Sequence, residues 1–272
     1  MYSTTTINNF EVEPVKIDET PKENILGYDM FPILYNNVFC IAKKKSGKAN
    51  VIYNILDKGT NKRTNILFFV PTFHRDAVYL KMAEMLDKKG IHYQVFSDII
   101  EDGVNVLDDI IKKLEEPEEI VSCDTKPVKT MFGIQQRTRP KKPKKLSPKH
   151  IIVLDDCGSS LKNSAVTKLL KINRHLHTRV IVSSQHQGDR FQQAFRQFDN
   201  LIIFKGLSQN IEKLEQIYRN ADLSVSFEEF VEMYRFATLR LFSFLYIDTR
   251  NNQYRVNFNK QILINESKYF LL

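Results

Sequence analysis

Short apolar runs alternate with stretches of helical periodicity along most of this sequence. The runs have the length and composition of buried strands, whereas the stretches between them place apolar residues three and four positions apart, as on one face of a helix. Strands that alternate with helices in this way predict an α/β fold, with a mostly parallel sheet covered by helices on both faces. The expected strands are 38–41, 66–71, 93–96, 151–154, 180–184 and 201–204, and the expected helices begin near Ala49 and cover 74–89, 104–114, 160–175, 191–197, 208–219 and 226–236.

The helix expected at 74–89 has the clearest local signals. Gly90 follows its last periodic residue, where a glycine commonly ends a helix. Its expected buried face consists of residues at helical spacing, namely Val78, Met82, Met85 and Leu86.

The end of the chain predicts a closing β-hairpin. The apolar run 242–247 leads through the turn residues 248–252 into a second alternating run at 254–258. We therefore expect one domain over 35–272 that ends in this hairpin. It follows a polar, acidic leader over 1–34 that is partly flexible and carries no apolar secretory segment.

A second irregular segment, at about 116–149, is rich in proline, lysine and threonine and lacks periodicity, which is typical of a loop insertion. Within it, the run RTRPKKPKK carries six positive charges, on Arg137, Arg139, Lys141, Lys142, Lys144 and Lys145. In a chain of net charge +8, so local an excess predicts a polyanionic partner. DNA backbone phosphates would fit, since such lysines read no bases. A solubilising loop and a nuclear-import patch are the alternatives.

Composition excludes some classes of protein. No apolar run reaches the 18–20 residues of a membrane helix, so we expect no membrane span. Cys40, Cys123 and Cys157 stand far apart without a CxxC pair, which favours reduced, partly buried thiols over a disulfide or metal site.

The stretch VFCIAKKKSGKA (38–49) resembles a phosphate-binding P-loop, G-x-x-x-x-G-K-[ST], with two residues changed. Ala42 replaces the first glycine, at a cost of about 1 kcal/mol if that position needs positive φ. Ala49 replaces the hydroxyl residue that ligates Mg²⁺, and water or Asn50 would have to fill its place. That loss predicts metal-dependent binding or turnover that is weaker by about ten- to hundredfold.

Two further strands end in polar residues. In HIIVLDDC (150–157), Asp155 and Asp156 stand at the carboxyl end of a strand, where parallel sheets bind ligands and where P-loop NTPases hold Mg²⁺ and polarise water. A solvated turn is the alternative. In RVIVSSQ (179–185), Gln185 could sense a γ-phosphate or position water, unless it is a surface amide.

Together these segments resemble the DNA-packaging ATPases of large DNA viruses and virophages, within the FtsK/HerA group of P-loop ATPases. The resemblance covers about 35–260 and rests on an ordered series: HIIVLDDC, NRHLHTRVIVSSQ with Arg174 and His175, FRQFDNLIIFKG, FEEFVEMY and FSFLYIDTRNNQYRVNFN. It implies a RecA/FtsK-like fold and an ATP- and Mg²⁺-dependent motor that works as a ring of copies. Such a motor moves double-stranded DNA into a capsid, with a capsid or portal protein as partner, in the host cytoplasm or the virion.

The resemblance also implies residue roles. Nucleotide binding falls to Ser46, Gly47, Lys48, Ala49 and Asn50, with Lys48 on the β- and γ-phosphates. Asp155 would serve Mg²⁺, Asp156 the catalytic water and Gln185 the sensor role. Arg196, with Arg190 second, would reach a neighbouring copy's nucleotide, unless both lie on a solvated helix face.

Other functions stay open at this point. An inactive, DNA-binding and ring-forming descendant of the same fold is favoured by Ala42 and Ala49. Another P-loop enzyme, such as a helicase, is a further alternative. A small-molecule kinase would need a lid with acceptor-substrate arginines, and the later arginines fit the motor pattern better.

Overall fold

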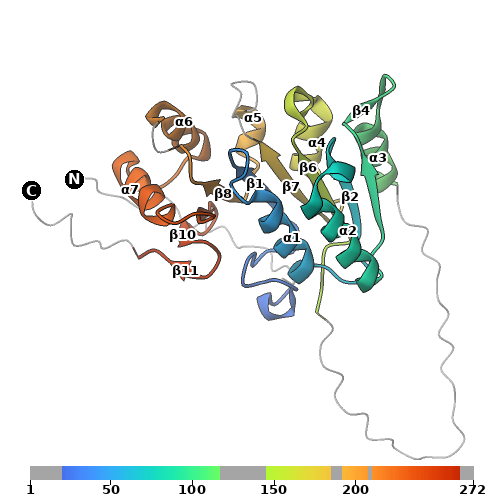
Figure 1. Ribbon diagram of the computed structural model, residues 1–272, viewed down its shortest axis with the longest axis horizontal. Helices are drawn as coiled ribbons and strands as arrows, with labels where there is room; N and C mark the ends of the chain where they lie inside the picture. The colour runs from blue at the N-terminus through green and yellow to red at the C-terminus, as the bar shows by residue number, and fades with distance from the viewer. Residues whose placement is uncertain (1–19, 117–144, 185–191, 208–209, 264–272) are drawn as a thin grey trace, which may run out of the picture.

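The structure, a computed structural model, describes residues 20–116, 145–184, 192–207 and 210–263 (Figure 1). In these residues nine strands form one sheet in the order β11-β10-β9-β8-β1-β7-β6-β2-β3. The strands from β8 to β3 are parallel, and β9, β10 and β11 extend the sheet antiparallel. The strands are β1 Asn37–Ile41, β2 Asn65–Phe69, β3 Tyr93–Phe96, β6 His150–Asp155, β7 Thr178–Ser184, β8 Asn200–Phe204, β9 Phe244–Asp248, β10 Gln253–Val256 and β11 Lys260–Gln261.

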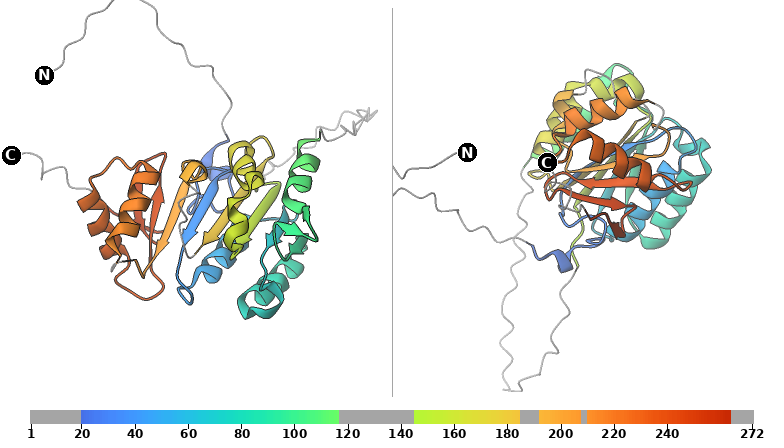
Figure 2. Two further views of the ribbon diagram at one scale, coloured as in Figure 1. Left: turned by 90° about the horizontal axis from the view of Figure 1, so that it is seen from above. Right: turned by 90° about the vertical axis from the view of Figure 1, so that its left-hand side faces the viewer.

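Helices cover both faces of this sheet, as the alternation of strands and helices predicts (Figure 2). One face carries α1 (Lys48–Gly59) and α2 (Ala77–Lys89). The other carries α3 (Val106–Glu115), α4 (Ser164–Ile172), α5 (Gln192–Phe195), α6 (Ile211–Ala221) and α7 (Phe227–Ala237). The predicted α/β fold and the closing hairpin of β9 and β10 are confirmed.

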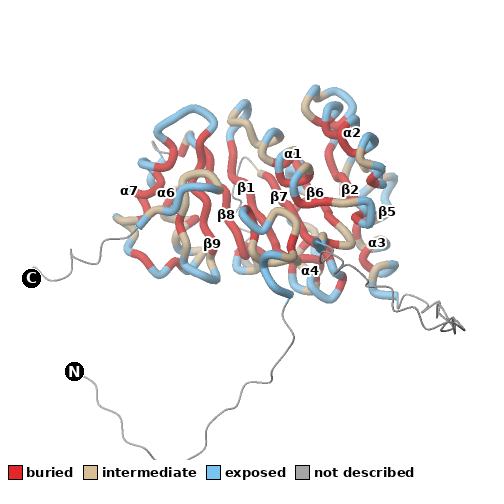
Figure 3. The backbone as a smooth tube through the Cα atoms, turned by 90° about the horizontal axis from the view of Figure 1, so that it is seen from below, coloured by how far each residue is buried: buried red, intermediate tan, exposed pale blue. Residues whose placement is uncertain are grey.

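The central strands are mostly apolar because both of their faces are buried (Figure 3). In β1, Val38 and Cys40 pack beneath α1 and α2, whereas Phe39 and Ile41 pack against the helices of the opposite face. Successive side chains of a strand point to opposite faces, so this one strand contributes to both cores.

Several expected elements begin at other residues in the structure. The helix expected at 74–89 is a 3₁₀ turn, Phe73–Arg75, followed by α2, because Asp76 caps α2 by accepting the Val78 N–H at 2.8 Å. Asn105 likewise caps α3, which follows the small hairpin of β4 (Ile100–Glu101) and β5 (Val104–Asn105). Asn163 caps α4, which follows the 3₁₀ turn Gly158–Lys162. The last hairpin begins at Phe244, because Phe242 has φ 62° and is exposed.

The buried face of α2 was predicted nearly correctly. Met82, Met85 and Leu86 are buried, but Tyr79 takes the place expected for Val78, which is only half-buried. Tyr79 also lies at helical spacing from Met82 and Leu86, so the choice between the two neighbours depends on where the helix begins.

Part of the expected leader belongs to the core. Residues 1–19 lie outside the described part of the chain, but Ile25, Met30 and Phe31 are buried. Leu26 N–H donates to the carbonyl of Leu146 at 2.8 Å, which joins this segment to the end of the expected insertion. The rest of that insertion, 117–144, is not described. Among the described helices, none has the length and apolarity of a membrane span.

Candidate nucleotide-binding site

The loop between β1 and α1 has the backbone of an anion site. It leaves the centre of the sheet, where β1 pairs with β7 and β8, and enters α1 at Gly47. Lys45 and Gly47 both have positive φ, 63° and 95°. Gly47 is the N-cap of α1 and offers no side chain to its first amides, so these N–H groups and the helix dipole point at the space above the loop.

Lys48, the first residue of α1, meets both predicted acids. Its Nζ lies 2.8 Å from Asp155 Oδ1 and 2.5 Å from Asp156 Oδ1. The two carboxylates stand at the carboxyl end of β6, two strands from β1 across β7. Burial lowers the pKa of Lys48, but the two carboxylates outweigh it, so the pKa is raised and the side chain stays charged.

Tyr79 completes the surroundings of Asp155. Its hydroxyl donates to Asp155 Oδ2 at 2.6 Å, so both oxygens of this buried carboxylate are engaged. Burial and the nearby carboxylate raise the pKa of Tyr79 well above its usual range, and Tyr79 remains a neutral donor. Asp156 is more accessible, with its side chain 34% exposed. The two acids therefore differ, one fixed and one open to solvent.

The residues present can hold a hydrated Mg²⁺. This ion keeps several waters and takes one or two carboxylates in addition to substrate phosphates. Asp155 and Asp156 supply carboxylates, and within the described chain the buried hydroxyls of Ser46 and Ser183 have no hydrogen-bond partner. Ser183 pairs with Asp155 in the sheet register. No group of three or more His, Cys, Asp or Glu forms a self-sufficient metal site among the described residues, so the phosphates would have to contribute ligands.

The two substituted loop positions have different consequences. Ala42 is buried and does not have positive φ, and its N–H donates to the Ser184 carbonyl at 3.2 Å. The strain considered for alanine at this position is therefore absent. Ala49 is half-buried in the first turn of α1, and Asn50, the residue considered as its substitute, is exposed.

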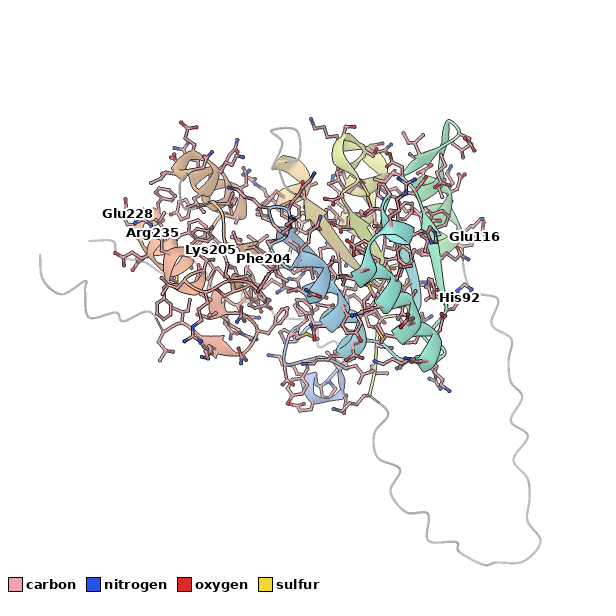
Figure 4. All side chains as sticks on the ribbon, viewed as in Figure 1. His92, Glu116, Phe204, Lys205, Glu228 and Arg235 are labelled. Carbon is pink, nitrogen blue, oxygen red and sulfur yellow. The ribbon has the colours of Figure 1, made fainter. Side chains whose placement is uncertain are left out.

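Phe242 is a neighbour of this loop that the sequence did not reveal. It is 64% exposed at φ 62°, and a Cβ added at Gly47 would lie 3.1 Å from its ring. Lys205 at the end of β8, labelled in Figure 4, holds the same 238–243 loop by donating to the Leu239 carbonyl at 3.1 Å. Exposed aromatic residues carry no sequence pattern, so only the fold could bring Phe242 here.

The other predicted site residues are distributed as follows. Gln185 and Arg190 lie outside the described residues, although Gln185 directly follows Ser184, the last residue of β7. The basic run is likewise undescribed except for Lys145, which is exposed. Arg196 precedes β8 and therefore lies at the amino edge of the parallel strands, opposite Lys48. Its predicted role toward a neighbouring copy stays a prediction.

Comparison with known proteins gives structural matches alone. No protein-family model matches this chain, and no curated protein sequence matches it significantly. One similar structure is the genome packaging NTPase B204 of Sulfolobus turreted icosahedral virus 2 in complex with AMP, with TM-score 0.50, 18% identity, 85% of this chain covered and 100% of that chain. Another is B204, the DNA-packaging ATPase of Sulfolobus turreted icosahedral virus, with TM-score 0.51, 18% identity, and 83% and 98% covered. This chain therefore has the fold of these viral packaging NTPases.

Proposed function

We propose that this protein is a viral genome-packaging ATPase of the FtsK/HerA group, which hydrolyses ATP to move double-stranded DNA into a capsid. The observation that carries the proposal is the contact of Lys48 with Asp155 and Asp156 at the amino end of α1. A lysine and two acids at that place in this fold are the parts that a P-loop NTPase uses. The names of the similar B204 proteins, a packaging NTPase and a DNA-packaging ATPase, support the same function.

The nucleotide occupies the space above the β1–α1 loop. Amides of Ser46, Gly47, Lys48, Ala49 and Asn50 face its phosphates, and Lys48 leaves the two acids to bind the β- and γ-phosphates. The acids thereby become available. Asp155 then serves Mg²⁺, which neutralises charge on the phosphate oxygens when bound, and Asp156 orients the attacking water.

The assembled motor supplies the remaining groups. Gln185 acts as the γ-phosphate sensor, and Arg196 or Arg190 reaches the nucleotide of an adjacent copy in a ring. The basic residues between Arg137 and Lys145 contact DNA phosphates without sequence preference. A capsid or portal-vertex protein is the further partner, in the host cytoplasm or the virion.

ATP turnover tests this proposal. Phosphate release by the full chain should rise with linear duplex DNA and Mg²⁺, and Lys48→Ala should reduce it by at least about ten- to hundredfold. Lys58→Ala is the matched control, because Lys58 is an exposed lysine near the other end of α1. Turnover that survives Lys48→Ala would contradict the assigned site, and strand separation in place of translocation would indicate a helicase.

A non-hydrolysing descendant of the same fold is the second candidate. Ala49 favours it, because alanine offers Mg²⁺ no oxygen where the P-loop pattern has a hydroxyl. Binding of DNA and nucleotide without phosphate release would identify this alternative.

A further inference from the structure

A buried carboxylate forms the floor of a second polar cavity. Asp199 is 5% exposed and stands just before β8. Its Oδ2 accepts the Asn37 N–H at 2.8 Å, and its own N–H donates to the Asn37 carbonyl at 3.0 Å. Asp199 is thus fixed to the beginning of β1 by two hydrogen bonds, one through its side chain and one through its backbone.

Two arginines from distant parts of the chain meet at Asp199. Arg250 Nε lies 2.5 Å from Asp199 Oδ1, and Arg174 Nη2 lies 3.4 Å from the same oxygen. Burial raises the pKa of Asp199 to about 6, against the lowering effects of the Asn37 N–H and Arg174. The two arginines therefore stabilise the buried negative charge of Asp199, and Asp199 in turn holds their guanidinium groups in fixed positions.

More cations line the same cavity, which has a volume of about 360 Å³. They come from three separate segments: Lys171, Arg174 and His175 at the end of α4 and in the turn after it, Arg196 after α5, and Arg250 in the β9–β10 turn. Among the described residues that line the cavity, Asp199 is the one carboxylate. Four Lys and Arg side chains against one acid leave an excess of positive charge.

This cavity is separate from the candidate nucleotide site. Asn37 and Asp199 stand at the amino ends of β1 and β8, whereas Lys48 and Asp155 stand beyond the carboxyl ends of β1 and β6. The two sites therefore occupy opposite edges of the parallel sheet.

The chemistry of the cavity suits an anion reached from solvent. Arg174 and Arg250 keep 53% and 36% of their side chains exposed, so a ligand in solvent can reach both side chains. A guanidinium presents N–H groups in a planar fork that matches phosphate oxygens, and Asp199 holds these forks in place before a ligand arrives.

We infer that this cavity, through Lys171, Arg174, His175 and Arg250 around Asp199, binds the sugar-phosphate backbone of double-stranded DNA. The inference takes its ligand from the proposed function and adds a contact surface outside the basic run at 137–145. Three separate parts of the chain bring cations to one place, where they can neutralise neighbouring phosphates of a DNA backbone. Recognition is independent of sequence, because every contact is to phosphate.

Duplex binding as a function of salt tests the inference. The full chain is titrated with a fluorescent DNA duplex, with nucleotide absent, and Arg174→Gln/Arg250→Gln is compared with Arg75→Gln/Lys81→Gln. The control pair removes two exposed charges from the other side of the sheet. The cavity variant should bind at least tenfold more weakly, and the slope of log K against log [salt] should become shallower by about 1.8, at about 0.9 for each lost phosphate contact. The control should keep both values.

Conservative and compensated variants guard against misfolding. Arg174→Lys/Arg250→Lys keeps the charges and should keep the salt slope. The triple variant Asp199→Asn/Arg174→Gln/Arg250→Gln removes the buried acid along with its partners and should bind as weakly as the double variant while unfolding at the wild-type temperature.

The outcomes separate this inference from the proposed function. Tight duplex binding by the double and triple variants, with unchanged slopes, would overturn the cavity and leave DNA binding to other residues. Polyglutamate, an acidic polypeptide, is the competing ligand. If the double variant loses as much affinity for polyglutamate as for duplex DNA, or if the wild-type chain binds polyglutamate more tightly than duplex DNA, the cavity binds an acidic protein segment and the inference is overturned. Failure of the proposed function appears instead as phosphate release that is absent or insensitive to Lys48→Ala.

Discussion

Ala49 stands where the P-loop pattern has a hydroxyl residue that ligates Mg²⁺. It lies in the first turn of α1, one residue after Lys48, and packs half-buried on the core beneath that helix. Ala49→Thr restores the hydroxyl of the P-loop pattern and should raise ATP turnover and Mg²⁺-dependent nucleotide affinity by about tenfold or more. Initial rates over a range of Mg²⁺ concentrations would measure both.

Ala49→Val is the matched control for shape. Valine has nearly the volume of threonine but no oxygen, so it should leave the Mg²⁺ dependence at the level of the natural chain. Equal gains in the valine and threonine variants would mean that packing, not metal ligation, limits the site.

Gly47 is a position in the β1–α1 loop where both backbone conformation and space favour glycine. Its φ is 95°, and an added Cβ would lie 3.1 Å from the Phe242 ring. Gly103 also has positive φ, at 79°, but an added Cβ there would meet nothing within 4 Å. Alanine at Gly103 should cost about 1–2 kcal/mol of unfolding free energy from backbone strain alone. Gly47→Ala should cost more and should weaken nucleotide binding.

Denaturant unfolding of both alanine variants measures this difference. Adding Phe242→Ala to Gly47→Ala should restore the part of the unfolding free energy that is lost through the clash with the ring. The part that is lost through the positive φ of residue 47 should remain. No recovery in that double variant would show that the Phe242 ring moves aside without cost.

At the level of the elements, one buried arginine helps to dock the segment from Phe31 to Asn36 onto the sheet. Arg179 is the second residue of β7, directly before its apolar residues, and is fully buried. Its Nε donates to Asn36 Oδ1 at 2.6 Å, its Nη2 donates to the carbonyls of Ile33 and Leu34, and its guanidinium lies 5.0 Å from the Phe31 ring centre. The segment from Phe31 to Asn36 therefore docks through side chain and backbone together.

Arg179→Met should undock this segment. Methionine fills similar space but leaves three acceptors without donors, so the free energy of unfolding should fall by about 3 kcal/mol or more. Arg63→Met, at an exposed arginine, should change it by less than about 0.5 kcal/mol. Hydrogen exchange at 31–36 should accelerate selectively in the Arg179 variant, and uniform acceleration across the sheet would contradict a docking role.

The sequence predicts the repeating elements of this fold better than their special contacts. Periodicity finds every strand of the parallel sheet, because each is a short, mostly apolar run, and all except the edge strand β3 are largely buried on both faces. The parallel topology that this periodicity predicts is enough to place Lys48 near Asp155 and Asp156, as the structure has them. Periodicity cannot find Arg179, since a buried arginine looks like the polar boundary of a strand. The role of Tyr79 at Asp155 depends on the start of α2, which the Asp76 cap shifts to Ala77.

On the scale of the whole molecule, the two edges of the sheet divide the polar chemistry. The carboxyl edge brings together the β1–α1 loop and the acids after β6, and the amino edge carries the arginine-lined cavity around Asp199. β1 runs directly from one to the other, since Asn37 lines the cavity and Ile41 leads into the β1–α1 loop. A five-residue, fully buried strand is a rigid connection between the two sites.

The buried thiols report on opening of the whole sheet. Cys40 lies in the middle of β1 and Cys157 follows β6, and burial raises the pKa of each to about 12. At pH 8 a thiol of that pKa is about one ten-thousandth thiolate, and the thiolate is the reactive form. In the Cys123→Ser variant, iodoacetamide should therefore modify these two thiols only through opened molecules.

Nucleotide should then slow this modification by mass action. A ligand that binds only the folded chain stabilises it by about 2.7 kcal/mol at a hundredfold excess over Kd, which reduces the opened population by about a hundredfold. With saturating ATP and Mg²⁺, the rates of iodoacetamide modification of both thiols should fall by the same factor, and Lys48→Ala should abolish this protection. Protection of Cys157 alone would mean that the end of β6 opens separately from β1, and that the strand linking the two edges is not part of the same cooperative unit.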